Sequence, residues 1–156
     1  MSDLFDFIVV GGGTMGTGIV YVSAYAGYDV TVVEPSAERA EVCRRELKQA
    51  AQQAVTRGKL DADGAETMLA RIRYQSDIAA YDGPRPQVVI ETVSERRDLK
   101  HRVLAQIEAL RRQAPHLLCK NAVRQAIALG LDHRLQVIDF LTCYPDNIVH
   151  YSSLNF

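Results

Sequence analysis

The chain has 156 residues, of which 47% are hydrophobic, and this is enough for one domain with a single core. Its 18 basic and 19 acidic residues give a net charge of −1, which excludes the basic excess of nucleic-acid-binding surfaces. Three cysteines without C-x-x-C spacing indicate neither a disulfide framework nor a metal site, so we expect no metal and a reducing, cytoplasmic location.

No targeting or membrane-spanning segment is expected. Residues 1–6 lack the charged and apolar regions of a leader peptide, and no apolar run approaches the roughly 18 residues of a membrane helix. The sequence therefore predicts a soluble, unprocessed protein without a membrane partner.

A glycine-rich turn follows the first apolar run of the chain. Residues 7–10 predict a strand that is buried on both faces. Gly11, Gly13 and Gly16 then form the pattern G-x-G-x-x-G. In such a pattern the glycines allow a sharp turn, a close approach of pyrophosphate to the backbone, and close packing of helix on strand. The pattern indicates a nucleotide site, and its alternative is a flexible loop without a ligand.

The elements after this turn complete a β-α-β unit. A helix is predicted over residues 15–26, with Gly27 as its C-terminal cap and its first amides directed at phosphate. The strand predicted at residues 30–33 ends in Glu34, roughly 20 residues after the last glycine of the turn. A carboxylate there accepts the hydroxyls of an adenosine ribose and repels a 2′-phosphate. The motif therefore favours NAD over NADP.

Two helices are predicted where a plain nucleotide-binding fold needs only one. Ser36 is placed to cap a helix over residues 37–57, in which apolar residues recur at helical spacing until a glycine ends it. Asp61 or Asp63 is placed to cap a second helix over residues 64–72. The basic side of this hairpin either meets an anionic ligand or forms a solvated face.

The rest of the pattern alternates between strands and helices. Strands are predicted at residues 73–76, 87–91 and 116–119, and a helix that begins at Ser94 or Glu95 separates the last two. The alternation predicts an α/β fold of the Rossmann type, with a doubly wound parallel sheet and an inserted helical hairpin. A ligand is expected at the carboxyl ends of the strands.

Three runs of the sequence together resemble a known family. They are VVGGGTMGTGIVYVSAYAGYDVTVVEPS, RGKLDADGAETMLARI and VVIETVSERRDLKHRVLAQIEAL. From about residue 7 to residue 118 the chain resembles the N-terminal domain of L-3-hydroxyacyl-CoA dehydrogenases, a family that includes bacterial 3-hydroxybutyryl-CoA dehydrogenases. The resemblance implies an NAD-dependent oxidoreductase of fatty acid metabolism that moves hydride between C3 of a 3-hydroxyacyl-CoA and NAD.

The resemblance also implies roles for individual residues. Glu95 and Lys100 match the cofactor-contacting acid and lysine on the nicotinamide side, and Arg57 and Lys59 fall where the family touches the coenzyme A of an acyl-CoA substrate. Glu91 is interpreted either as functional or as a structural residue that accepts from backbone donors. The residues implied to bind NAD are Gly11, Gly13, Thr14, Met15, Gly16, Glu34, Glu95, Lys100 and Asn121.

The last part of the chain departs from the family. After the fifth strand the family reads S-N-T-S-S, whereas the run KNAVR keeps only the asparagine, Asn121. The family's histidine, which takes the hydroxyl proton of the substrate, lies in an H-F-F-N-P motif, and Asp139 or Leu141 takes its place here. His133 and His150 are isolated and are interpreted as surface residues. The catalytic residues are therefore unknown from the sequence.

These observations divide the chain and leave more than one interpretation of its function. We expect residues 1–119 to form the NAD-binding domain and residues 120–156 to form a divergent tail that packs on it or on a partner. The family's helical second domain, which makes its dimer, has no counterpart in this length, so exposed apolar surface is expected to favour a homo-oligomer or a partner chain. The chain is either the cofactor-binding part of a dehydrogenase, or an NAD(H)-binding module or truncated remnant without turnover. A hydride-transfer enzyme for another substrate, with Tyr144 or His133 as acid, is a further alternative.

Overall fold

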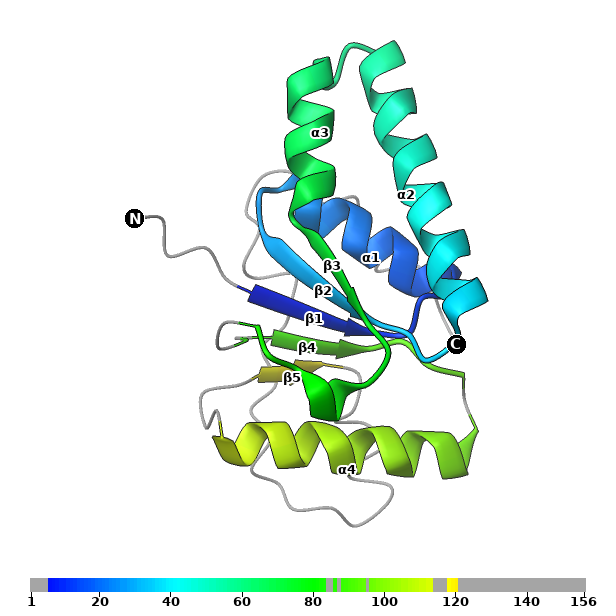
Figure 1. Cartoon of the computed structure of the whole chain (residues 1–156), viewed down its shortest axis with the longest axis vertical. Coiled ribbons are helices and arrows are strands. Elements are labelled where there is room, and N and C mark those ends of the chain that lie inside the picture. The colour runs from blue at the N-terminus through cyan, green and yellow to red at the C-terminus, as the bar shows by residue number, and fades with distance from the viewer. Residues whose placement is uncertain (1–5, 84–85, 87, 95, 114–117, 121–156) are drawn as a thin grey trace.

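A computed structural model of the chain describes residues 6–83, 86, 88–94, 96–113 and 118–120. Within these residues the chain forms one five-stranded sheet (Figure 1). All its strands are parallel, and their order across the sheet is β3-β2-β1-β4-β5. The strands are β1 (Asp6–Val10), β2 (Asp29–Val33), β3 (Ile72–Gln75), β4 (Val88–Glu91) and β5 (Leu118–Lys120).

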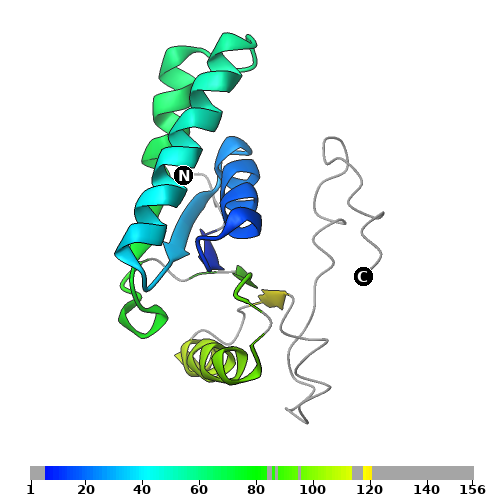
Figure 2. The ribbon, with the colours of Figure 1, turned by 90° about the vertical axis from the view of Figure 1, so that its right-hand side faces the viewer.

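Helices cover both faces of this sheet. The helices are α1 (Thr14–Tyr25), α2 (Ala37–Thr56), α3 (Ala62–Ala70), the short 3-10 helix η1 (Ile78–Ala80) and α4 (Arg97–Gln113). The first three pack on one face and the last two on the other, and Figure 2 shows α4 and the α2–α3 pair at opposite ends of the described part. The predicted doubly wound Rossmann-type sheet with an inserted helical hairpin is confirmed.

The central strand β1 supplies side chains to both hydrophobic cores. Phe7 and Val9 point to the core beneath α1, α2 and α3, whereas Ile8 and Val10 point to the core beneath α4 and η1. Ile8 and Val9 are fully buried. Such a strand is apolar at successive positions because neither of its faces meets water, and this explains the unbroken apolar run in the sequence.

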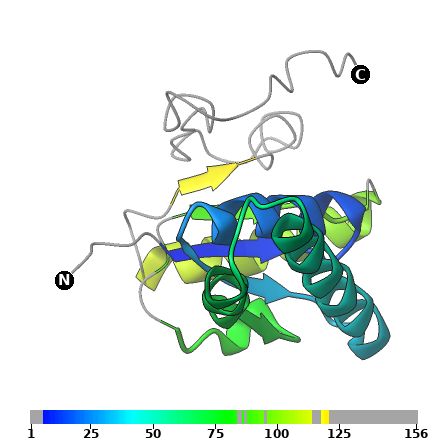
Figure 3. The same cartoon turned by 90° about the horizontal axis from the view of Figure 1, so that it is seen from above.

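The inserted hairpin is defined by its caps. Ser36 Oγ accepts the amide of Arg39 at the start of α2, and Asp61 Oδ1 accepts the amide of Gly64 at the start of α3. Gly58, with φ at +67°, allows the turn between the two helices. Ser36 is confirmed as a cap, and Asp61 rather than Asp63 takes that role for α3. The two helices lie side by side when the molecule is seen from above (Figure 3).

Some boundaries differ from those predicted. Helix α4 begins at Arg97 rather than at residue 94 or 95, because the carbonyl of Ser94 accepts the amide of Arg96 in a tight turn and the first helical bond runs from the amide of Lys100 to the carbonyl of Arg96. The strand predicted at residues 116–119 is β5, at Leu118–Lys120. The edges of α1, α3 and β3 also shift by one or two residues, as is usual where helix and strand ends fray.

A polar cluster fixes α2 against the edge strand β3. The guanidinium carbon of Arg44 lies 4.2 Å from the centre of the Tyr74 ring, a cation–π contact. Burial raises the pKa of Tyr74 to about 12 and also raises the pKa of the neighbouring Cys43 thiol. Cys43 is fully buried, so we interpret it as a core residue rather than a reactive thiol.

Candidate functional site

The turn between β1 and α1 and the first turn of α1 exclude side chains at one position each. Gly11 has φ at +111°, which L side chains rarely adopt. A Cβ on Gly16 would overlap the carbonyl oxygen of Gly11, so the first turn of α1 packs directly on the loop. Gly13 precedes the helix and provides no side-chain cap for its first amides. These amides and the positive end of the helix dipole can therefore face an anion.

The carboxylate of Glu34 is fixed beside this turn. Its Oε2 accepts the amide of Gly12 over 2.9 Å, and its Oε1 accepts the amide of Ser36 over 3.0 Å. Each oxygen keeps a further lone pair, so the carboxylate can still accept hydroxyl donors. The acid at the end of β2 and the turn after β1 therefore form one hydrogen-bonded unit.

Thr92, directly after β4, closes the turn from the other side. Its hydroxyl lies 3.0 Å from the carbonyl oxygen of Val10 and 3.1 Å from that of Gly11, and it donates its one proton to these acceptors. Its Oγ1 would also lie 2.7 Å from a Cβ on Gly11 and 2.8 Å from a Cβ on Gly16. Small residues in the turn are thus required by the threonine as well as by the helix.

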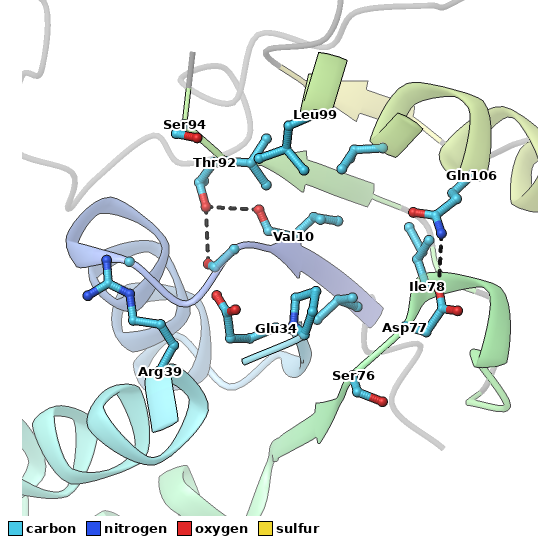
Figure 4. Close-up of a pocket in the computed structure, with 16 residues that line it drawn as sticks. Val10, Glu34, Arg39, Ser76, Asp77, Ile78, Thr92, Ser94, Leu99 and Gln106 are labelled. Atoms are coloured by element: carbon cyan, nitrogen blue, oxygen red, sulfur yellow. Dashed lines mark hydrogen bonds between the residues drawn. The ribbon is translucent and has the colours of Figure 1, made fainter. Parts of the chain in front are cut away.

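A cavity of about 530 Å³ lies at the carboxyl ends of the strands, where the strand order reverses between β1 and β4. Gly13 and Arg39 line one end of this cavity. Figure 4 shows Glu34 between Arg39 and a pair formed by Asp77 and Gln106. In open α/β sheets this switch point is where ligands bind.

The walls between Glu34 and the Asp77–Gln106 pair are apolar. Leu99, Val103 and Gln106 recur at helical spacing, so that one face of α4 lines the cavity, and Ile78 from η1 lines it beside Asp77 (Figure 4). A flat, partly apolar group such as a nucleobase fits between such walls.

Arg39 places a cation at the glycine end. It lies in the first turn of α2, is exposed, and its Nη2 would be 3.8 Å from a Cβ on Gly13. A guanidinium at this distance from the turn can pair with a phosphate that the turn binds.

The predicted cofactor residues do not all lie in the cavity. Gly11, Gly13 and Glu34 line it. Thr14, Met15 and Gly16 form the first turn of α1, beside the cavity, and the side chain of Met15 is exposed. Glu95 and Asn121 lie outside the described residues.

Lys100 is buried and does not line the cavity. Its ammonium is 2.8 Å from Oε2 of Glu91, and Oε1 of Glu91 accepts the amide of Val93 over 2.7 Å. This geometry supports the structural interpretation of Glu91. The predicted contact of Lys100 with the cofactor stays a prediction.

Arg57 and Lys59 lie at the other end of α1 from the glycine turn. Arg57 caps the C-terminus of α2, and the backbone carbonyl of Lys59 accepts the hydroxyl of Tyr25, the last residue of α1. Neither residue lines the cavity. The predicted contact with coenzyme A would therefore take place on a separate surface, on the α2–α3 hairpin.

Gly12, Arg39 and Thr92 are parts of the site that the sequence motifs did not predict. The position of Thr92 carries a signal that could have identified it, because it follows the strand that pairs with β1, and carboxyl ends of parallel strands meet at one edge. Gly12 contributes its backbone amide, and a pattern of residue types does not predict a contact that the backbone makes. Arg39 carries no motif in the sequence, since its proximity to the turn depends on the tertiary fold.

The cavity fits the adenosine half of a dinucleotide. The turn and the first amides of α1 would hold the pyrophosphate, and any side chain on Gly13 would enter that space. Glu34 would accept the ribose hydroxyls, and the apolar walls would contact the base. No group of three or more histidine, cysteine or acidic side chains in the described part of the chain could hold a metal ion. The described helices also include none with the length and hydropathy that a membrane crossing requires.

Comparisons with known proteins agree with this geometry. The family model described as "3-hydroxyacyl-CoA dehydrogenase, NAD binding domain" matches residues 7–128. The chain is 32% identical over 122 residues to 3-hydroxybutyryl-CoA dehydrogenase of Mycobacterium tuberculosis, an alignment that covers 78% of this chain and 42% of that protein. It is 37% identical over 107 residues to 3-hydroxyadipyl-CoA dehydrogenase of Escherichia coli, covering 69% of this chain and 22% of that protein.

A solved structure shows the same relationship. The crystal structure of 3-hydroxybutyryl-CoA dehydrogenase from Escherichia coli superimposes with a TM-score of 0.65 at 33% identity, over 75% of this chain and 24% of that one. This chain thus spans less than half the length of the relatives that it matches. The described site and these matches together show that the chain belongs to the 3-hydroxyacyl-CoA dehydrogenase family, of which it is an NAD-binding domain.

Proposed function

We propose that this chain is the cofactor-binding part of an NAD-dependent oxidoreductase that moves hydride between C3 of a 3-hydroxyacyl-CoA and NAD. The observation that supports this most directly is the bond between Gly12 and Glu34, which holds a phosphate turn and a ribose acid in one unit. When bound, NAD supplies the hydride acceptor. The residues of this chain bind and orient it: Gly13 and the start of α1 at the pyrophosphate, and Glu34 at the ribose.

The substrate and the setting belong to the same proposal. The matched relatives are named for dehydrogenation of 3-hydroxybutyryl-CoA and 3-hydroxyadipyl-CoA, which supports an acyl-CoA substrate. Arg57 and Lys59 are the cations we propose for its anionic groups. We place the protein in fatty acid metabolism in the cytoplasm, as a homo-oligomer or with a partner chain.

A second function is an NAD(H)-binding module without turnover. The observation that favours it is the run KNAVR at residues 120–124, where the family has S-N-T-S-S, together with Asp139 or Leu141, neither of them a histidine, at the place of the family's base. Such a module would bind the cofactor through the same residues and would regulate or accompany a complete enzyme.

One experiment tests whether the chain binds the cofactor and whether it turns over on its own. NADH is titrated with the purified chain, and the fluorescence of NADH itself is recorded. NADH is excited directly because the chain has no tryptophan to act as an energy donor. Acetoacetyl-CoA is then added and the loss of NADH absorbance is recorded. Binding with turnover supports a dehydrogenase whose catalytic residues this chain supplies. Binding without turnover supports either a cofactor-binding part that needs another segment or chain for catalysis, or the module. Absence of NADH binding would contradict both.

A further inference from the structure

A hydrogen-bonded carboxylate and amide close the end of the cavity opposite to the glycine turn. Gln106 Nε2 donates to Asp77 Oδ1 over 3.1 Å, and the same oxygen accepts the amide of Ala79 over 2.9 Å. Asp77 precedes η1 and Gln106 lies in α4, so the pair connects two elements across the cavity end (Figure 4).

The order of groups along the cavity determines what meets this pair. In a dinucleotide the adenosine ribose lies between the pyrophosphate and the base. Glu34 lies between the glycine end and the Asp77–Gln106 pair. If the ribose binds Glu34, as the proposed function has it, the base lies between the apolar walls and its edge faces Asp77 and Gln106.

Both side chains retain hydrogen-bonding capacity that adenine can use. The interactions of Asp77 with Ala79 and Gln106 use only Oδ1, so Oδ2 can accept another proton. Gln106 has a second amide proton, and the orientation of its amide is set because only the NH₂ group can donate to a carboxylate. Adenine has an amino group on C6 that donates and ring nitrogens that accept.

We propose that Asp77 and Gln106 recognise the edge of the adenine base. Asp77 Oδ2 accepts from the 6-amino group, and the second Gln106 amide proton is donated to a ring nitrogen. The pair makes the cavity selective for a base with a donor at position 6. A purely structural pair would instead cap η1 and tie it to α4 without affecting base selection.

The test compares NADH with reduced nicotinamide hypoxanthine dinucleotide. Hypoxanthine has a carbonyl oxygen at position 6, which would face the carboxylate of Asp77. The wild-type chain is expected to bind NADH about five- to tenfold more tightly, the effect of roughly one lost hydrogen bond. Titration with each dinucleotide gives its dissociation constant. The ratio of the two constants does not change when a substitution weakens the binding of both dinucleotides equally.

Asp77→Asn is the decisive variant. It retains an oxygen that can accept from Ala79 and Gln106, but replaces the second oxygen with a donor that suits a carbonyl. The preference for NADH should fall to one or reverse. Asp82→Asn is the matched control, because Asp82 accepts from Gln75 Nε2 over 2.7 Å in a similar pair that does not line the cavity. This control should keep the wild-type ratio.

The outcomes distinguish this assignment from the proposed function. Equal affinities of the wild-type chain for the two dinucleotides, or an unchanged ratio in Asp77→Asn, would overturn the base recognition while leaving NAD binding intact. A ratio that falls equally in Asp82→Asn would overturn it too, as an effect of charge alone. Failure of the wild-type chain to bind NADH would overturn both.

Discussion

The ammonium of Lys100 lies 2.8 Å from the carboxylate of Glu91, and only 6% and 1% of the two side chains are exposed. The pair ties α4 to the end of β4, directly before the segment from Thr92 to Ser94 that lines the cavity. Removing one partner of so deeply buried a pair leaves the other charge in a medium of low polarity. We therefore expect loss of one partner to lower the stability of the fold, whatever it does to ligand binding.

Lys100→Met is expected to lower the free energy of unfolding by about 3–5 kcal/mol, because Glu91 stays buried and loses its ammonium. Urea denaturation followed by circular dichroism measures this. Adding Glu91→Gln removes the buried charge and should restore part of the stability. As a control, Arg102→Met breaks an exposed pair with Asp98 and should change stability by less than about 1 kcal/mol. Equal stability of the single and double variants would contradict the coupling.

Gly13→Asp is expected to abolish NADH binding while the fold is retained. A Cβ at Gly13 meets only the Arg39 guanidinium, so the side chain fits, but it places bulk and negative charge at the pyrophosphate position. Aspartate also caps helices well, so thermal stability should be unchanged or higher by about 1 kcal/mol. Thermal melting and NADH titration on one sample test both effects. NADH affinity equal to wild type would refute the assignment of this turn.

Two further glycines in α1 should respond in opposite ways to alanine. Gly16→Ala is expected to destabilise the fold strongly, by about 3 kcal/mol or more, because the new methyl group overlaps the backbone of Gly11. Gly18→Ala meets nothing within 4 Å and should stabilise the helix by up to about 1 kcal/mol. Thermal unfolding of the two variants gives the comparison, and a similar midpoint for both would be inconsistent with the close packing at Gly16.

Glu34→Gln is expected to weaken NADH binding by about tenfold, since a charged acceptor is lost at the ribose. Binding of NADPH should improve relative to NADH because the charge that repels a 2′-phosphate is gone, and Arg39 remains nearby as a cation. Titration with both dinucleotides measures the ratio. Glu38→Gln, an exposed change in the first turn of α2, should leave the ratio unaltered. If Glu34→Gln also left it unaltered, Glu34 would not determine cofactor choice.

Tyr74 should make the fold sensitive to alkaline pH. Burial, the largest cause, raises its pKa from the ordinary 10.0 to about 12, so the folded state holds the phenol proton more firmly than the unfolded state. The stability from this group is complete below pH 10 and is lost as the pH rises towards 12. Between pH 9 and pH 11 the wild-type chain should lose more stability than Tyr74→Phe. Parallel pH profiles of the two proteins would contradict this.

Local signals in the sequence were sufficient for most of the fold. The apolar run around Ile8 and Val9 identified a strand buried on both faces, and the cap at Ser36 identified the start of α2. Both features depend on residues that are close to one another in the sequence, so a sequence pattern can reveal them. The start of α4 was placed too early, because the backbone of Ser94 and Arg96 forms a tight turn before the helix, which no residue type at these positions indicates.

The candidate site was harder to predict, because several of its residues come from distant parts of the sequence. The glycine motif and Glu34 follow a known spacing, whereas Thr92, Arg39, Asp77 and Gln106 come together only when the sheet and its helices have assembled. The burial of Lys100 against Glu91 also depends on how α4 packs. A resemblance can suggest that Lys100 contacts the cofactor, but it does not record which face of the helix is turned to the sheet.

The bond from Gly12 to Glu34 joins residues 22 positions apart and has a consequence for the thermodynamics of binding. A glycine-rich loop in an unliganded protein would ordinarily sample many conformations, and a ligand would have to restrict them on binding. Here a carboxylate from the neighbouring strand already restrains the loop. The entropy cost of ordering the loop is therefore met during folding, and more of the interaction energy remains as affinity for the dinucleotide.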